Sequence, residues 1–292
     1  MRPSTVIKAA AAQIDCVLCD LEANLQKHLE MIHRARAAGV EVLLFPEMSL
    51  TGYQVGARSV EVAIGMDDPL LGRLADAAGD MTVVVGFVEE GFAAQFFNSA
   101  VALKNGKAVF HHRKLNPATY GNLDEGKYFA TGRYVETFRL KPPFSASVMI
   151  CADLWNPALV YLAALHGTTL MFVPICSAHE SVGGEFSNPR GWDLALRFYA
   201  MIYGMPLIMT NRVGREDGLT FWGGSRILDA HGEVLAEAGE GEELIVADID
   251  YQDVREARFG LPTVRDSNLA LIQREVARLV DQVGVPDSIR RE

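Results

Sequence analysis

Short apolar runs alternate with longer amphipathic stretches along the chain. The apolar runs are rich in β-branched and aromatic residues and predict strands at 7–14, 42–45, 82–87, 98–103, 148–151, 170–173, 206–211 and 225–228. Stretches with helical spacing predict helices at 21–38, 69–79, 157–167 and 189–204. This alternation is typical of a layered α/β protein whose sheets are buried on both faces.

Two short segments predict β-hairpins. Residues 103–108 contain Asn-Gly and residues 228–234 contain His-Gly, each between β-prone flanks. Hairpins pair antiparallel strands, so we expect mixed sheets. The chain has no tandem repeat and no linker rich in proline, glycine or serine, which favours one domain.

The C-terminal tail, residues 266–292, carries apolar residues at roughly helical spacing between Asp266 and Val283. They are Leu269, Leu271, Ile272, Val276, Leu279 and Val280. Two interpretations are equally compatible with this pattern: the tail packs against its own chain, or it contacts a partner subunit.

Composition narrows the class of partner. The chain has 292 residues, of which 49% are hydrophobic and 22% charged, and its formal net charge is −10. This charge and the lack of a Lys/Arg-rich run argue against nucleic-acid binding and favour a small-molecule or protein partner. No stretch is apolar enough for a signal peptide or a membrane span, so we expect a cytoplasmic protein without a membrane partner.

The four cysteines, Cys16, Cys19, Cys151 and Cys176, are too few and scattered for a disulfide framework. Cys16 and Cys19 form a C-x-x-C, but no second Cys/His pair completes a zinc site, and we interpret the segment as a loop. Cys176 follows an apolar run and is predicted to pack near a strand end. The seven histidines are dispersed, and we expect no metal and no cofactor.

Cys151 is the most informative residue because it lies where a predicted strand ends and a helix can begin. Residues 145–150 favour a strand, and Pro157 suits the first turn of a following helix. Main-chain N–H groups would then face the sulfur, lower the pKa of the thiol and hold an oxyanion. A buried, inert thiol is the alternative interpretation.

Two further residues are candidates for chemistry. Glu47 follows the apolar run Val42–Phe45 and Pro46, so its carboxylate should emerge at a strand end, where ligands bind in open α/β sheets. Lys114 lies in a short basic cluster immediately after the predicted strand at 108–112. Taken singly, a strand-end glutamate is more often a helix-capping or solvated residue than a base, and a solvated loop is the favoured interpretation of Lys114.

The three residues together form an ordered signature. Glu47 lies in Leu-Leu-Phe-Pro-Glu-Met-Ser-Leu-Thr-Gly-Tyr, Lys114 in Arg-Lys-Leu-x-Pro, and Cys151 in Cys-x-Asp-x-Trp-x-Pro. This signature resembles the nitrilase or carbon–nitrogen hydrolase superfamily, and the resemblance covers residues 5–265. We therefore expect a carbon–nitrogen hydrolase domain over residues 1–265, with the tail 266–292 belonging to it or forming an oligomer contact.

The resemblance implies a four-layer α-β-β-α sandwich and defined catalytic roles. Cys151 would be the nucleophile, Glu47 the general base, and Lys114 a cation that stabilises the oxyanion together with the N–H of Ala152. Glu125, in Tyr-Gly-Asn-Leu-Asp-Glu-Gly, matches a second glutamate of the family and would position substrate and lysine. The predicted pocket walls are Tyr53, Tyr120, Trp155, Ser177 and His179.

The motifs around Tyr120 and Cys151 are most similar to the glutaminase domain of glutamine-dependent NAD synthetase, here standing alone. Ala152 and Asp153 follow the cysteine, which favours amides over nitriles. The 292 residues lack a Ser-Gly-Gly-x-Asp-Ser loop for ATP, so we expect no NAD synthesis by this chain itself. The segment after Cys176 lacks the basic residue of glutamine-binding relatives, with Arg190 arriving late, which argues against glutamine.

The sequence therefore favours a cofactor-free amidohydrolase that converts a small linear amide into a carboxylate and ammonia through a Cys151 thioester. A nitrilase and an N-carbamoyl amine or amino-acid hydrolase use the same residues and stay open. A non-catalytic binding module on the same scaffold is the alternative of another class. The resemblance also implies a homodimer or higher homo-oligomer, built from the helix at 157–167 and the tail.

Overall fold

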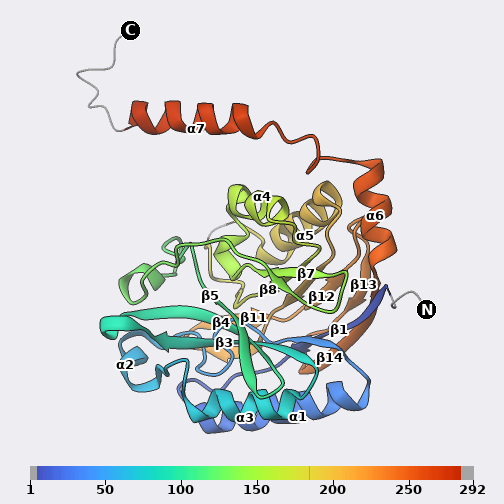
Figure 1. The fold of residues 1–292 in the computed structure, drawn as a ribbon. Coiled ribbons are helices and arrows are strands. Elements are labelled where there is room, and N and C mark those ends of the chain that lie inside the picture. The colour runs from blue at the N-terminus through green and yellow to red at the C-terminus, as the bar shows by residue number, and fades with distance from the viewer. Residues whose placement is uncertain (1–4, 184, 284–292) are drawn as a thin grey trace.

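Two six-stranded sheets pack face to face in a computed structural model that describes residues 5–183 and 185–283 (Figure 1). The first sheet, in the order β14-β1-β2-β3-β4-β5, comprises β1 (Val6–Gln13), β2 (Val42–Leu44), β3 (Thr82–Glu90), β4 (Phe96–Lys104), β5 (Lys107–Arg113) and β14 (Glu243–Asp250). The second, in the order β13-β12-β9-β8-β7-β6, comprises β6 (Phe138–Arg139), β7 (Ser145–Val148), β8 (Leu170–Pro174), β9 (Leu207–Thr210), β12 (Arg226–Leu228) and β13 (Val234–Glu237).

Both sheets have the same sequence of strand pairings. An antiparallel pair at one edge is followed by two parallel pairs, β1–β2 and β2–β3 in one sheet and β7–β8 and β8–β9 in the other, and then by two antiparallel pairs. Both sheets are thus mixed, as predicted.

Parallel neighbours need crossover connections, which pass through helices on the outer faces. These are α1 (Leu21–Ala37), the short α2 (Ser59–Val62) and α3 (Pro69–Ala78) for the first sheet, and α4 (Pro157–Leu165) and α5 (Asn188–Tyr203) for the second. Figure 1 shows α1 and α3 below the first sheet and α4 and α5 above the second. The predicted α-β-β-α sandwich is therefore confirmed, with helix boundaries within two residues of those expected.

The buried strands explain why the apolar pattern was informative. On β1, Ala9 and Ala11 belong to the core between the two sheets, while Ala10 and Ala12 pack in the core beneath α1 and α3. A strand that is covered on both faces has no side in contact with water, so its sequence is a continuous run of apolar residues.

The sequence pattern did not predict several elements. Among them are β14, the hairpin of β10 (Val213–Glu216) and β11 (Leu219–Trp222), and helix α6 (Tyr251–Gly260). β14 is an edge strand paired only with β1, and the exposed acidic residues Glu243 and Asp248 interrupt its apolar run. For the hairpin, the Asp217-Gly218 dipeptide was an available turn signal.

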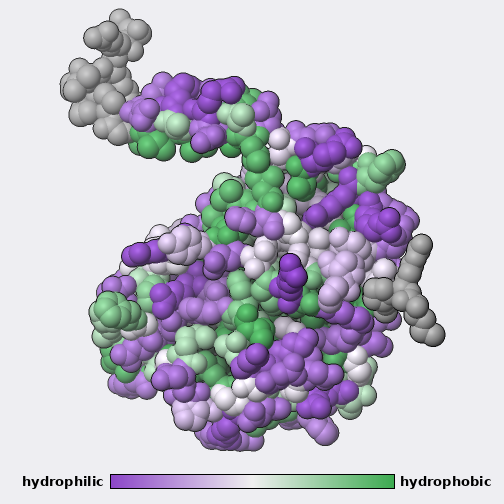
Figure 2. Space-filling view, viewed as in Figure 1, coloured by the Kyte–Doolittle hydropathy of each residue, from purple (hydrophilic) through white to green (hydrophobic). Residues whose placement is uncertain are grey.

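The tail forms a helix, α7 (Leu269–Val283), that projects from the body (Figure 1). None of its residues is buried, and in Figure 2 its hydrophobic residues gather on the side turned toward the body. Packing of the tail against its own chain is thus not found among the described residues. The remainder of the tail lies outside them. No helix in the described part of the chain has both the length and the apolar content needed to cross a bilayer.

Gly86 on β3 makes room for the turn that carries Glu47. A Cβ atom at this position would lie 2.5 Å from the backbone N of Met48 and 2.7 Å from the carbonyl oxygen of Pro46. Both neighbours are backbone atoms, which cannot rotate away. The absence of a side chain at Gly86 therefore allows the turn to pack directly on the sheet.

We expect Gly86→Ala to lower the free energy of unfolding by about 1–3 kcal/mol, because the added methyl group must displace the Glu47 turn. Gly72→Ala is the matched control. Gly72 lies within α3 with nothing near its Cβ position, so alanine there should raise stability by about 0.5–1 kcal/mol. Chemical denaturation of both variants measures the difference, and equal effects would contradict the packing argument.

Candidate active site

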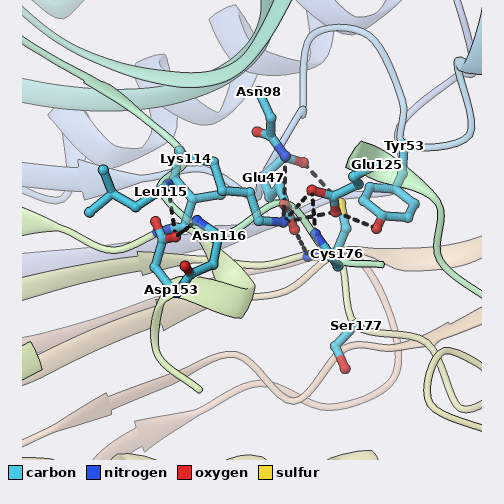
Figure 3. Close-up of polar contacts among 12 residues, drawn as sticks. Glu47, Tyr53, Asn98, Lys114, Leu115, Asn116, Glu125, Asp153, Cys176 and Ser177 are labelled. Carbon is cyan, nitrogen blue, oxygen red and sulfur yellow. Dashed lines mark hydrogen bonds and ion pairs between the residues drawn. The ribbon is translucent and has the colours of Figure 1, made fainter. Parts of the chain in front are cut away.

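Three of the predicted residues meet in a buried ion cluster between the sheets (Figure 3). The ammonium of Lys114 lies 2.6 Å from Oε1 of Glu47, and 2.8 Å and 2.7 Å from Oε1 and Oε2 of Glu125. Lys114 has no exposed surface, so the alternative of a solvated loop lysine is wrong. A buried ammonium needs such partners, because an unpaired charge in the interior costs several kcal/mol.

Glu47 is held by both of its carboxylate oxygens. Oε1 also accepts a hydrogen bond from Nδ2 of Asn98 at 2.7 Å, and Oε2 accepts one from the backbone N–H of Cys176 at 2.7 Å. Asn98 belongs to β4 of the first sheet, whereas Cys176 follows β8 of the second. The carboxylate is therefore fixed between the sheets, three residues beyond the end of β2.

Cys151 opens a single 3-10 turn, Cys151–Asp153, at the third residue after the end of β7. Its φ is +45°, a left-handed conformation that is uncommon for a side chain other than glycine and is found at functional sites. The N-terminus predicted to face the sulfur is that of this short turn. α4 begins only at Pro157, where Asn156 caps it, so α4 does not begin beside the sulfur as expected.

The sequence-based prediction of a lowered thiol pKa is wrong. Burial raises the pKa of Cys151 well above its ordinary value, and the nearby Glu47 carboxylate raises it further. Lys114 and the N–H of Cys176 pull the pKa of the thiol down but do not outweigh burial. Cys151 therefore rests as a neutral thiol at neutral pH and needs a base for ionisation.

The pKa of Glu47, the candidate base, is raised, as the sequence analysis leads us to expect for a buried carboxylate. Burial raises the pKa of Glu47, and this effect exceeds the opposing attraction of Lys114. For Lys114, burial acts to lower the pKa, but the carboxylates of Glu125 and Glu47 outweigh it and hold the pKa well above the usual range. Lys114 is therefore a permanent cation here.

Tyr53 belongs to the cluster itself and is more than a pocket wall. Its hydroxyl donates to Oε1 of Glu125 at 2.5 Å, and its backbone N–H donates to Oε1 of Glu216 at 2.9 Å. Glu216 pairs with the fully buried guanidinium of Arg212, which also donates to Asp15. The unpredicted β10–β11 hairpin thus supports the residue that orients Glu125.

The other predicted wall residues lie in different surroundings. Tyr120 is partly exposed, and burial together with the neighbouring Cys151 raises the pKa of its hydroxyl. Trp155 packs on Trp192, with ring centroids 4.5 Å apart. The Ser177 hydroxyl accepts from Nε1 of Trp192 at 3.0 Å and lies away from the ion cluster (Figure 3). His179 is exposed on the turn after β8.

Residues 8–259 match the family described as Carbon-nitrogen hydrolase. The chain belongs to the carbon-nitrogen hydrolase family. It is therefore an enzyme that hydrolyses carbon–nitrogen bonds, and the resemblance inferred from the three motifs is confirmed. The matched segment spans both sheets and ends within α6, before the projecting tail helix.

Similar proteins include members with different substrates. The chain is 29% identical over 252 residues to a glutamine-dependent NAD(+) synthetase of Thermotoga maritima, covering 85% of this chain and 42% of the synthetase. It is 27% identical to an N-carbamoylputrescine amidase of Solanum tuberosum, covering 89% and 92% of the two chains. An amidase of Nesterenkonia AN1 shares the fold with a TM-score of 0.79 at 23% identity, covering 94% and 98%. The chain spans about half or less of the NAD synthetases that it matches.

The sequence motifs did not indicate the supporting roles of three residues at this candidate site: Asn98, Cys176 and Asp153. Asn98 and Cys176 hold Glu47, and the buried carboxylate of Asp153 accepts hydrogen bonds from the backbone on both sides of the site. A polar residue inside an apolar strand run was a usable signal for Asn98. In the described part of the chain, no three His, Cys, Asp or Glu side chains are grouped so as to hold a metal ion.

The raised pKa values generate a test with iodoacetamide, which alkylates thiolates. In the wild type, the alkylation rate of Cys151 should rise with pH through pH 9 without a plateau, because its pKa lies well above 9. Glu47→Gln removes a negative charge that raises this pKa, so the curve should move to lower pH. Turnover should nevertheless fall by about 10²–10⁴-fold, because the candidate base is lost.

Peptide mass spectrometry of Cys151 at a series of pH values measures the alkylation rate, and steady-state kinetics measure turnover. Glu90→Gln serves as the control, since Glu90 is exposed at the end of β3. A plateau near neutral pH in the wild type would mean a preformed thiolate and would refute the assignment of a neutral resting thiol.

Proposed function

We propose that this chain is an amidase that hydrolyses a small linear amide to a carboxylate and ammonia through a thioester on Cys151. The observation that carries the proposal is the water-excluded Glu47–Lys114–Glu125 cluster around a buried thiol on a left-handed turn. Such a site contains a base, a fixed cation and a nucleophile, which are the groups that acyl transfer requires.

In the first half-reaction, the sulfur of Cys151 attacks the carbonyl carbon of the amide while its proton passes to Glu47. Negative charge moves to the carbonyl oxygen, where the ammonium of Lys114 and the N–H of Ala152 stabilise it. The Ala152 N–H is available because the first N–H groups of a helical turn lack intrahelical partners. Glu47 then returns the proton to the nitrogen, the C–N bond breaks, and ammonia leaves.

In the second half-reaction, Glu47 takes a proton from a water molecule that attacks the thioester carbon. The resulting oxyanion collapses, the C–S bond breaks, and the carboxylic acid leaves while Cys151 regains a proton. Glu47 must accept and donate protons in turn, and the rise of its pKa caused by burial makes the carboxylate a better proton acceptor. Glu125, held by Tyr53 and by the backbone N–H of Ala118, keeps Lys114 in place.

The surroundings of the thiol favour a small, uncharged acyl group. Cys151 is only 6% exposed, and the aromatic residues Tyr53 and Tyr120 lie close to the cluster. Arg190, the late-arriving cation considered for a glutamine carboxylate, is exposed in the first turn of α5. A glutamine substrate therefore has no evident charged partner from this residue.

An N-carbamoyl amine is the second candidate substrate, because the matched plant enzyme is an N-carbamoylputrescine amidase and is covered over 92% of its length. A nitrile substrate has weaker support from the residues that follow Cys151. Ammonia with carbon dioxide indicates a carbamoyl substrate, ammonia with a carboxylate indicates an amide or a nitrile, and a matched nitrile separates these last two.

The activity test uses acetamide, propionamide, benzamide, glutamine, N-carbamoylputrescine and propionitrile, with ammonia as the readout. We expect the highest kcat/KM with a small aliphatic amide, and Cys151→Ala should abolish its turnover. Cys19→Ala should retain activity, since Cys19 lies in a partly exposed loop. In a variant of the Nesterenkonia amidase, the acetamide moiety of fluoroacetamide is covalently added at the active-site cysteine, and we expect the same adduct on Cys151.

Turnover that survives in Cys151→Ala would sink the thioester mechanism. Failure of every compound in the panel, in a wild-type protein that also resists fluoroacetamide, would favour the non-catalytic binding module.

We also propose that the chain forms a homodimer or larger homo-oligomer through α7 and the α4–α5 face. One side of α7 carries Leu269, Ile272, Val276, Leu279, Val280 and Val283, all exposed. The outer helices add the exposed residues Leu162, Leu194, Phe198 and Met201. Exposed apolar faces of this extent mark contacts with another protein surface. A cytoplasmic location stays a prediction from the sequence.

Gel filtration tests the assembly. The wild type should elute above the monomer mass of 31.9 kDa, and Val276→Asp should shift it toward the monomer by placing a charge in the apolar face. Arg274→Asp, on the opposite side of α7, should leave the elution volume unchanged. A monomeric wild type would contradict the proposal.

A further inference from the structure

The nucleophile and the lysine belong to different sheets. Lys114 follows β5, and its N–H continues the ladder of the first sheet by donating to the carbonyl of Asn98 at 2.8 Å. Cys151 follows β7, and the N–H of Met149, the first residue after that strand, donates to the carbonyl of Phe172 in the second sheet at 2.9 Å. Ladder hydrogen bonds fix each residue within its own sheet. They do not set the separation between the two.

The carboxylate of Asp153 bridges these two segments. Its Oδ1 accepts from the backbone N–H groups of Leu115 at 2.9 Å and Asn116 at 2.7 Å, directly after Lys114 (Figure 3). Its Oδ2 accepts from the backbone N–H of Ile150 at 3.0 Å, directly before Cys151.

The bridge is buried and further supported. Asp153 has no exposed surface, so its bonds are not shared with bulk water. The ring of His112, on β5, places Nε2 3.3 Å from Oδ2 and adds a contact from the first sheet. Charge-assisted hydrogen bonds in such surroundings are strong and hold their partners in a narrow geometry.

We infer that Asp153 is a positioning residue that sets the separation between the Cys151 sulfur and the Lys114 ammonium. The inference rests on the proposed function, in which Cys151 attacks and Lys114 stabilises the oxyanion. Asp153 acts entirely through the backbone of the two segments. Its loss should therefore impair the chemical step more than substrate binding.

Asp153→Asn tests the role with little change in volume. An asparagine keeps one oxygen, but its NH₂ group faces backbone N–H donors in either orientation, so one of the two segments loses its acceptor. We expect kcat to fall about 10- to 100-fold, as a displacement of about 1 Å produces, with KM changed less than about threefold. A large fall in kcat with little change in KM indicates a positioning role, whereas a large rise in KM would indicate lost substrate binding.

Alkylation of Cys151 by iodoacetamide provides a readout that does not depend on turnover. Lys114 lowers the pKa of the thiol, so a lysine that moves away should shift the alkylation curve of Asp153→Asn to higher pH. Asp124→Asn is the matched control, because Asp124 is exposed in the loop before Glu125, and it should leave kcat and the curve unchanged. Leu74→Ala, which truncates a core residue beneath the first sheet, controls for lost stability.

Asn116→Pro is a second variant in case Asp153→Asn does not fold. It removes one N–H donor to Oδ1 without altering the carboxylate, and the position already precedes Pro117, which favours the extended backbone that proline adopts. Its effects should have the same direction.

Folded variants with unchanged kcat and an unchanged alkylation curve would overturn the inference. An equal shift in Leu74→Ala would also overturn it, since lost stability would then explain the effect. If the wild type hydrolyses no compound of the panel, the proposed function is refuted but the inference about Asp153 is not. The alkylation curve of Cys151 still tests that inference, because it does not depend on turnover.

Discussion

The burial of one lysine between two glutamates is the constraint on which the rest of the site depends. Three charges lie where the sheets meet, and Lys114 and Glu47 have at most 1% of their surface exposed. Removing one partner of such a cluster leaves an uncompensated buried charge, at a cost of about 3–5 kcal/mol. The surrounding backbone must therefore supply every remaining hydrogen bond, and this requirement determines the geometry of the nearby turns.

The two-sheet architecture meets that requirement by bringing strand ends together. Glu47 follows β2, the middle parallel strand of the first sheet, and Cys176 follows β8, the middle parallel strand of the second. The backbone N–H of Cys176 donates a hydrogen bond to the carboxylate of Glu47. Away from the cluster, Gln13 of β1 accepts from Ser225, next to β12, and the Thr210 hydroxyl donates to the carbonyl of Leu44. Side-chain hydrogen bonds between the two sheets thus fix their alignment, since no backbone strand pairing joins one sheet to the other.

The sequence was sufficient for the residues whose signals are local. Glu47 and Cys151 each follow an apolar run, Lys114 lies in a basic cluster after a predicted strand, and Glu125 has matching neighbours, so short motifs located the cluster. The partners Asn98, Cys176 and Asp153 were missed because they meet Glu47 and the lysine segment across 51, 129 and 37–38 residues of sequence. The edge strand β14 was missed because its exposed acidic residues break the apolar pattern.

The predicted direction of the thiol pKa shift was wrong for the same reason. Local reasoning considered the N–H groups after Cys151, whereas burial by two sheets and the charge of Glu47 dominate. The high pKa of the Cys151 thiol is consistent with the proposed reaction once the charges of Glu47, Lys114, Glu125 and Cys151 are considered together. With a neutral thiol, one ammonium and two carboxylates give a net charge of −1, and proton transfer from Cys151 to Glu47 leaves that charge unchanged. A preformed thiolate would instead add a second net negative charge in a site with little water, which burial strongly disfavours. In the proposed mechanism, the same burial that raises the thiol pKa couples its ionisation to Glu47, so the proposed nucleophile and base act in one step.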